Sequence, residues 1–243
     1  MSEGTGGLVK LVLGVLKDIS RRIDQTMLKY DKSIKDYESF VESSDGYGFR
    51  SLVVPSVVVR HVAPIAKTPV AGVAGFPHGY QPVEAKAKEI EAIAEGGGKE
   101  VDVVVNIVNL KSGLISSVKD ELSTLTNLAH QLGLGIKFIV ETSALSDDEL
   151  RMIAELVLES GADFIKTNTG YGRRGVWLRD ILLIRSVVGG KLKVKASGGI
   201  RNSVDAALLV LAGADVLGTS SGIQIVEDSR KVAEILESSG IRP

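Results

Sequence analysis

Two lysines lie inside apolar runs of this 243-residue chain, and they are the residues best suited to chemistry. Lys166 belongs to "DFIKTNTG" (163–170), and Lys195 belongs to "KLKVKAS" (191–197). A lysine is seldom fully buried unless it is paired. One complete β/α unit separates the two runs, so we expect the two side chains to stand on adjacent parallel strands at similar height.

Two ammonium groups at that separation repel, and burial disfavours the charged form further. One lysine should therefore lose its proton well below the usual pKa of about 10.4. A neutral amine is a nucleophile, and activation by burial or by a second cation is typical of lysines that form Schiff bases with carbonyl compounds. Asp102, in another apolar run, could then move a proton to or from the reacting carbon or the carbinolamine hydroxyl, directly or through water.

Short β-rich runs alternate with segments of helical period along the chain. We predict strands over 22–28, 51–57, 69–76, 100–108, 135–142, 163–168, 191–197 and 214–220. We predict helices over 83–97, 117–133, 146–161, 177–190, 203–214 and 226–240, a weaker one over 31–42 and a short one near 58–66. Eight β/α units in a chain of this length predict a TIM (β/α)8 barrel. A doubly wound open sheet is the competing architecture, but no dinucleotide-type glycine fingerprint follows the first strand.

No linker or change of composition divides the chain, so we expect a single barrel domain over residues 1–243. An additional amphipathic helix is predicted over 8–20, with the apolar run "LVKLVLGVL". This helix should either cap the bottom of the barrel or pack on another subunit. Lysine interrupts the run, which is too short to span a bilayer.

The composition narrows the choice of partners. A formal net charge of -1 gives no basic footprint for nucleic acid. The absence of cysteine excludes disulfides, thiolate chemistry and cysteine-ligated metals. The three histidines, His61, His78 and His130, lack metal-ligand spacing, so neither a metal nor a cofactor is expected. Without a convincing secretory signal or membrane span, we predict a soluble cytoplasmic protein.

In such a barrel the active site lies at the carboxyl ends of the strands. The polar residues near those ends are Asp24, Thr26, Asp102, Asn106, Lys137, Glu141, Lys166, Asn168, Lys195, Ser197, Thr219 and Ser220. We expect Asp24 and Lys137 among them to contact the substrate. The alternative for Lys137 or Lys193, taken singly, is that the side chain faces the helices or the solvent, the usual fate of a lone charged residue in a strand.

Two glycine-rich segments, "KASGGIRNSVDAA" and "LGTSSGIQIVED", follow the seventh and eighth strands. Each places small residues between a strand end and a helix start, where backbone N–H groups can hold an anion. Barrels often bind phosphate at this pair of loops. Thr169 in "TNTG" adds a third side to the predicted phosphate site. A single Gly-Gly turn indicates tight packing, but two in these two units favour phosphate.

These segments resemble the motifs of the DeoC family of class I aldolases, the deoxyribose-phosphate aldolases. The motifs are "GFPHG", "EVDVVVNI", "LKSG", "KFIVET", "FIKTNTG", "KASGGIR" and "GTSSG", and the resemblance runs in the family's order from about residue 22 to 226. It implies that Lys166 forms the Schiff base, that Lys195 lowers its pKa, and that Asp102 relays protons. It also implies phosphate contacts at Gly170, Gly198, Gly199, Ser220 and Ser221.

The reaction that the resemblance implies is reversible aldol cleavage of 2-deoxy-D-ribose 5-phosphate to D-glyceraldehyde 3-phosphate and acetaldehyde. The family also implies a homo-oligomer, a dimer or a tetramer. Three positions depart from the family pattern: Asn168 replaces serine, Tyr171 replaces phenylalanine, and Val108 replaces glycine. None removes a reacting group, so they bear on substrate fit. The alternatives are another Schiff-base aldolase or a transaldolase on the same barrel, and a phosphate-binding barrel without catalysis.

Overall fold

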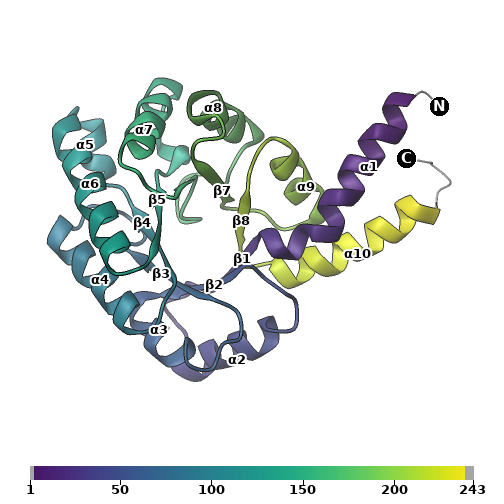
Figure 1. Ribbon diagram of the computed structural model, residues 1–243, viewed down its shortest axis with the longest axis horizontal. Coiled ribbons are helices and arrows are strands. Elements are labelled where there is room, and N and C mark those ends of the chain that lie inside the picture. Colours follow the sequence, from purple (N-terminus) through teal and green to yellow (C-terminus); the bar gives the residue numbers. More distant parts are fainter. Residues whose placement is uncertain (1–2, 239–243) are drawn as a thin grey trace.

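The computed structural model describes residues 3–238, in which eight parallel strands form a closed barrel surrounded by helices (Figure 1). The strands are β1 (Ile23–Thr26), β2 (Ser51–Pro55), β3 (Val70–Ala74), β4 (Glu100–Val104), β5 (Gly135–Ile139), β6 (Phe164–Lys166), β7 (Lys193–Ser197) and β8 (Val216–Thr219). Each strand pairs with the next, and β8 pairs with β1. The predicted (β/α)8 barrel is confirmed, and the open-sheet alternative is wrong.

Helices follow the strands as the sequence predicts, and α5 is an additional short helix that it does not predict. They are α2 (Ile34–Ser44), α3 (Ser56–Val62), α4 (Val83–Glu95), α5 (Ile107–Lys111), α6 (Ile115–Gln131), α7 (Asp147–Glu159), α8 (Leu178–Val188), α9 (Ser203–Leu211) and α10 (Gly222–Ser238). Two 3-10 turns, η1 (Ile19–Arg22) and η2 (Thr142–Ala144), complete the described elements. Residues 239 and 240 of the last predicted helix lie outside the described residues.

The strand predicted over 100–108 is wrong at its end, because β4 stops at Val104 and α5 begins at Ile107. Asn106 causes the change. Its side-chain oxygen accepts a hydrogen bond from Asn109 N at 3.1 Å and so caps the helix. Since the apolar run continues from the strand into the helix, periodicity alone does not separate the two elements.

The additional helix α1 (Glu3–Asp18) lies along α10 and α9, on the outer side of the barrel (Figure 1). Leu16 of α1 forms a small apolar cluster with Ala207 of α9 and Ala233 of α10. The expectation that this helix caps the bottom of the barrel is therefore wrong, while its contact with another subunit stays a prediction. None of the helices in the described range is long and apolar enough to cross a membrane.

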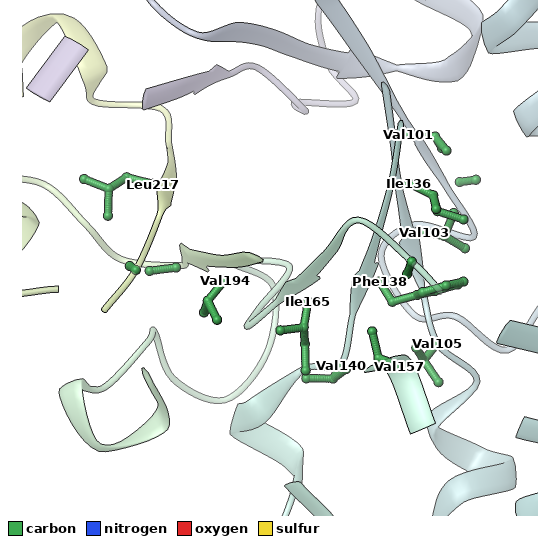
Figure 2. Close-up of a cluster of buried hydrophobic side chains, with 14 of the residues drawn as sticks. Val101, Val103, Val105, Ile136, Phe138, Val140, Val157, Ile165, Val194 and Leu217 are labelled. Carbon is green, nitrogen blue, oxygen red and sulfur yellow. The ribbon is translucent and has the colours of Figure 1, made fainter. Parts of the chain in front are cut away.

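Strand residues alternate between two environments. The outward-facing positions are apolar and pack beneath the helices, and Figure 2 labels Val101, Val103, Val105, Ile136, Phe138, Val140, Ile165, Val194 and Leu217 with Val157 of α7. The intervening positions include Asp102, Lys137, Lys166 and Lys195, which contact one another inside the barrel. The two-residue period of a strand thus places the apolar core on one face and the charged groups on the other.

A separate buried ion pair joins α4 to α6 outside the barrel interior. Lys86 and Glu121 are both buried and form an ion pair. The Lys86 ammonium also donates to the carbonyls of Gly79 at 2.5 Å and Val104 at 2.8 Å, while Glu121 accepts from Asn106 N at 3.1 Å. The pair therefore holds the chain after β3 and after β4, at the carboxyl ends of the strands.

We expect Lys86→Met to lower the free energy of unfolding by about 3–5 kcal/mol, because it leaves the Glu121 carboxylate buried without its cation. Combining it with Glu121→Gln should recover part of this loss. Urea denaturation measures both. Lys88→Met is the matched control, since Lys88 on the same helix is exposed and forms its ion pair with Glu91, so its loss should change stability little. A Lys86→Met loss no larger than the control would contradict this role.

Candidate active site

A cavity of about 520 Å³ opens at the carboxyl ends of β1, β6, β7 and β8. Its volume is in the range of small-molecule sites. Lys166 is the one member of the lysine pair that reaches its wall. The loops after the strands add Thr169, Gly170, Gly198, Gly199 and Ser220, and the side chains of Lys29, Lys32 and Arg201 contribute positive charge.

Lys166 and Lys195 are register partners on β6 and β7, as their spacing predicts. Both ammonium groups donate to the same oxygen of Asp102 on β4, with Nζ–Oδ2 distances of 2.8 Å for Lys166 and 2.7 Å for Lys195. Lys166 is 4% exposed, while Lys195 and Asp102 are completely buried. The Lys195 side chain lies against Gly218 of β8, where a Cβ would come within 2.9 Å of its Cε.

Lys137 on β5 belongs to the same cluster. Its Nζ donates to Asp102 Oδ1 at 2.9 Å and to Glu100 Oε2 at 2.8 Å, and its side chain is completely buried. The alternative that Lys137 faces the helices or the solvent is therefore wrong. Lys193, at the start of β7, is exposed, as that alternative expects. Two carboxylates of β4 account for the burial of Lys137, since a buried cation needs such partners.

Arg50 and Asp24 complete the cluster. The guanidinium of Arg50 donates to Asp24 Oδ1 at 2.6 Å and to Glu100 Oε1 at 2.9 Å. Asp24 Oδ2 also lies 2.6 Å from Lys195 Nζ. Asp24 and Lys137 thus bind other side chains within the barrel, and neither lines the cavity. The predicted direct contact of these two residues with a substrate does not fit this arrangement.

The cluster contains one more cation than carboxylates. Arg50, Lys137, Lys166 and Lys195 are its cations, and Asp24, Glu100 and Asp102 are its anions. Burial opposes ionisation of Asp102, but the neighbouring lysines outweigh burial and hold the pKa of Asp102 well below its usual range. The charges balance when one of the cations is neutral.

Lys166 is the cation that the structure makes easiest to deprotonate. Burial lowers its pKa most, the Asp102 carboxylate raises it, and repulsion from Lys195 lowers it again, so that the pKa of Lys166 falls from 10.5 to about 8. The sequence predicts that the pKa of Lys166 is lowered, but it names repulsion from Lys195 as the first cause. In the structure, burial is the larger cause. For Lys137, burial is outweighed by Asp102, Asp24 and Glu100, which raise its pKa.

Three of the loops that line the cavity contain backbone N–H groups without a protein acceptor in the described residues. Gly170, Gly199 and Ser220 line it, and within residues 3–238 their N–H groups donate to no protein acceptor. Gly198 and Gly199 have φ angles of +99° and +77°, which side-chain-bearing residues rarely adopt. Ser220 also precedes the start of α10, where the helix dipole favours an anion. These loops have the properties of an anion site.

Two other predicted phosphate contacts are already hydrogen-bonded within the protein. Thr169 lines the cavity, but its backbone N–H and its hydroxyl both donate to the Glu141 carboxylate, at 3.0 and 2.6 Å. Ser221 is not part of the cavity wall, and its N–H donates to Thr219 Oγ1 at 2.9 Å. The proposed contacts through Thr169 and Ser221 do not fit these bonds, while those through the other loop residues stay predictions.

The three departures from the family pattern lie at different distances from the cavity. Asn168 is buried and donates to the carbonyl of Ser197 at 3.2 Å, so its amide is part of the loop structure. Val108 is exposed on α5, away from the cavity wall. Tyr171 lines the cavity and donates its hydroxyl proton to the carbonyl of Leu28 at 3.0 Å. Of the three, only Tyr171 is placed to affect what the cavity accepts.

The sequence does not reveal every residue of the site. Glu100 has a signal, because it shares a strand face with Asp102 two residues later. Arg50 has none, since it precedes β2 and reaches the cluster only through its long side chain. Gln25 is also missed; it lines the cavity and accepts from Gly222 N at 2.9 Å, which holds the start of α10.

The histidines lie outside the cavity wall. His130 contacts Asp163 at 3.0 Å on the surface, and His78 stacks on Tyr80. In the described part of the chain, no group of three or more His, Cys, Asp or Glu side chains is arranged to hold a metal ion.

Replacing Lys166 with methionine should stabilise the fold at pH 7, because it removes the unbalanced buried cation. We expect the free energy of unfolding to rise by about 1–3 kcal/mol, since one pKa unit corresponds to about 1.4 kcal/mol. Between pH 8 and 10.5 the unfolded chain keeps a proton that folded Lys166 has released, so wild-type stability rises with pH and the gap to the variant narrows. Denaturant titrations across this range test it; a gap that widens with pH would contradict the lowered pKa.

Comparison with known proteins gives a consistent result. The chain matches the family model described as DeoC/LacD family aldolase over residues 21–234. It is 39% identical over 218 residues to a deoxyribose-phosphate aldolase of Thermococcus gammatolerans, covering 88% of this chain and 97% of that protein. It is 41% identical over 215 residues to deoxyribose-phosphate aldolase 1 of Bacillus licheniformis, covering 87% and 96%.

Solved structures agree. The aldolase QR15 superposes with a TM-score of 0.86 at 39% identity, covering 90% of this chain and 99% of that one. The tetrameric deoxyribose phosphate aldolase from Aeropyrum pernix gives a TM-score of 0.85 at 31% identity, covering 96% and 100%. By its sequence, its barrel and the length of the match, the chain belongs to the DeoC/LacD family of aldolases.

Proposed function

We propose that the protein catalyses reversible aldol cleavage of 2-deoxy-D-ribose 5-phosphate to D-glyceraldehyde 3-phosphate and acetaldehyde through a Schiff base on Lys166. The observation that carries this proposal is the Lys166 amine, which reaches the cavity, has a pKa of about 8 and lies 2.8 Å from a carboxylate. Such an amine is the nucleophile that Schiff-base chemistry needs. The names of the curated relatives support deoxyribose phosphate as the substrate.

The reaction follows from the free amine. Lys166 adds to the C1 aldehyde of the open-chain sugar, and the resulting carbinolamine loses water to give an iminium ion. The C3 hydroxyl then gives up its proton as the C2–C3 bond breaks, so that C3 becomes the aldehyde carbon of glyceraldehyde 3-phosphate and the bonding electrons pass to the iminium. The enamine that remains is protonated on carbon, and water releases acetaldehyde and the free lysine.

Asp102 and Lys195 have different roles in this scheme. Asp102 passes protons between the lysine cluster and the reacting atoms, directly or through water, because it accepts from Lys166 Nζ next to the cavity. Its low pKa also keeps it ionised, so it balances the charge of the iminium ion. Lys195 helps to keep the pKa of Lys166 low before the substrate binds. Neither role requires a metal or another cofactor.

The phosphate group of the sugar is proposed to bind at the three loops. Gly170, Gly198, Gly199 and Ser220 line the cavity that Lys166 also lines. A phosphate held by their N–H groups would orient the sugar so that its far end, with C1, meets the lysine. Arg201, in the same wall, adds positive charge.

We also propose that the whole chain forms one domain and assembles as a homo-oligomer, a dimer or a tetramer. The related protein from Aeropyrum pernix is described as tetrameric. Large apolar side chains are exposed on α8 and α9, including Leu182 and Leu208. Packing against a partner subunit would remove these side chains from water.

Borohydride reduction in the presence of acetaldehyde tests the proposed function. We expect peptide mass mapping to find one reduced ethyl group per chain on Lys166, because only this cluster lysine reaches the cavity. Lys166→Arg should abolish that label without changing the background on surface lysines. Labelling of Lys137 or Lys195 in place of Lys166 would overturn the assignment.

Lys195→Met should shift the acid limb of the pH–rate profile for cleavage to higher pH. Removing this cation takes away repulsion and leaves Asp102 more strongly attractive to Lys166, so the pKa of Lys166 rises and less free amine is present at neutral pH. The limb reports the coupled cluster as a whole. Lys193→Met, at an exposed position on the same strand, is the control and should leave the limb in place. A folded, less active Lys195→Met enzyme with an unmoved limb would point to a different role for Lys195.

A further inference from the structure

Glu141 stands out by its backbone conformation. It lies two residues after the end of β5 at Ile139, with Val140 between. Its backbone has φ 51° and ψ 67°, which is the left-handed region. Among the residues that the structure describes, it is the one non-glycine residue with positive φ. A glutamate has no local reason to adopt this conformation, and such strain persists where the surrounding structure imposes it.

The Glu141 carboxylate is bonded to the loop that follows the Schiff-base lysine. One oxygen accepts from Thr169 N at 3.0 Å and from Thr169 Oγ1 at 2.6 Å. The other accepts from the hydroxyl of Ser143. Thr169 Oγ1 in turn accepts from Tyr171 N at 3.1 Å, so the carboxylate fixes the turn of the loop through Thr169.

The loop backbone also packs directly on this carboxylate. A Cβ placed on Gly172 would overlap both Glu141 Oε1 and Ser143 Oγ. Within the described residues, Glu141 is 9% exposed and is not part of the cavity wall. In the described residues its hydrogen bonds are with the turn after β5 and the loop after β6, and none is with the lysine cluster. Glu141 therefore supports the loop and contacts no reacting group.

The hydrogen bonds around Thr169 leave a specific group for a ligand. The N–H groups of Thr169 and Tyr171, on either side of Gly170, are both used inside the loop. The Gly170 N–H between them has no protein acceptor in the described chain, and Gly170 lines the cavity. The carboxylate thus holds an anion-binding loop without itself meeting the anion, which it would repel.

We propose that Glu141 is a positioning residue: its strained backbone and buried carboxylate lock the loop 168–172 so that Gly170 presents its N–H to the phosphate of the substrate. This inference rests on the phosphate subsite of the proposed function. It also explains the left-handed conformation of Glu141, which places the carboxylate within hydrogen-bonding distance of Thr169. The bonds that it makes there offset the conformational cost.

The test is Glu141→Gly, which removes the carboxylate and suits the positive φ. Calorimetric titration with inorganic phosphate should show binding weakened about tenfold, the effect of losing roughly one hydrogen bond to a charged group. KM for deoxyribose 5-phosphate should rise by a similar factor, with a much smaller change for unphosphorylated deoxyribose. Acetaldehyde trapping on Lys166 should be unchanged, since the lysine cluster is untouched.

Two further variants keep the test decisive. Glu141→Gln retains an oxygen acceptor for Thr169 N and should give an intermediate phosphate affinity. This variant still tests the positioning role if Glu141→Gly folds poorly. Glu149→Gln replaces a half-buried carboxylate of α7, which bonds Ser146 and Lys111 and not the loop, and should leave phosphate binding unchanged.

The outcomes separate this inference from the proposed function. Phosphate affinity and KM that stay at the wild-type level in Glu141→Gly would overturn the positioning role. Equal losses of kcat on phosphorylated and unphosphorylated sugars would also overturn it, because Glu141 would then act on the chemistry. If the wild-type enzyme fails to trap acetaldehyde on Lys166, the proposed reaction is lost, but the phosphate titrations still decide the role of Glu141.

Discussion

The carboxylate of Asp102 is the point on which the interior of this barrel depends. Three lysine side chains donate to its two oxygens, and all four groups are buried or nearly so. Without this shared anion, three ammonium groups could not remain together in a low-dielectric interior. The strand register supplies the geometry, because Asp102 pairs with Lys137, and Lys166 pairs with Lys195. The lowered pKa of the Lys166 amine therefore depends on how four strands are aligned.

Binding and chemistry are located on different elements. The charged cluster stands mainly on strands, where alternation places one side chain in two inside the barrel. The groups suited to an anion stand on loops, and the loop after β6 is held from outside the cavity by the carboxylate of Glu141. Buried polar residues away from the reacting atoms thus decide where the backbone of the cavity wall lies.

The sequence predicts the barrel well because eight apolar runs alternate with helical periods, and that count has few other solutions. It also predicts Lys166 beside Lys195, since one β/α unit places two strands next to each other. It does not predict Arg50, whose side chain reaches the cluster from outside any strand. Lys137 is ambiguous in the sequence because its burial depends on Glu100 and Asp102 of a neighbouring strand. Such partnerships become visible only when the register is known.

Gly218 has a consequence for how this enzyme can change over evolution. Its missing side chain is the space that Lys195 fills, since a Cβ there would lie 2.9 Å from Lys195 Cε and 3.0 Å from Ser197 Cβ. Even alanine at this position would force the lysine away from Asp102 or push two strands apart. The barrel interior consequently offers few viable mutations, whereas loop residues such as Tyr171 and Arg201 can vary without moving an amine. Substitutions that alter the shape of the cavity are therefore easier to accept at its rim than in the lysine cluster.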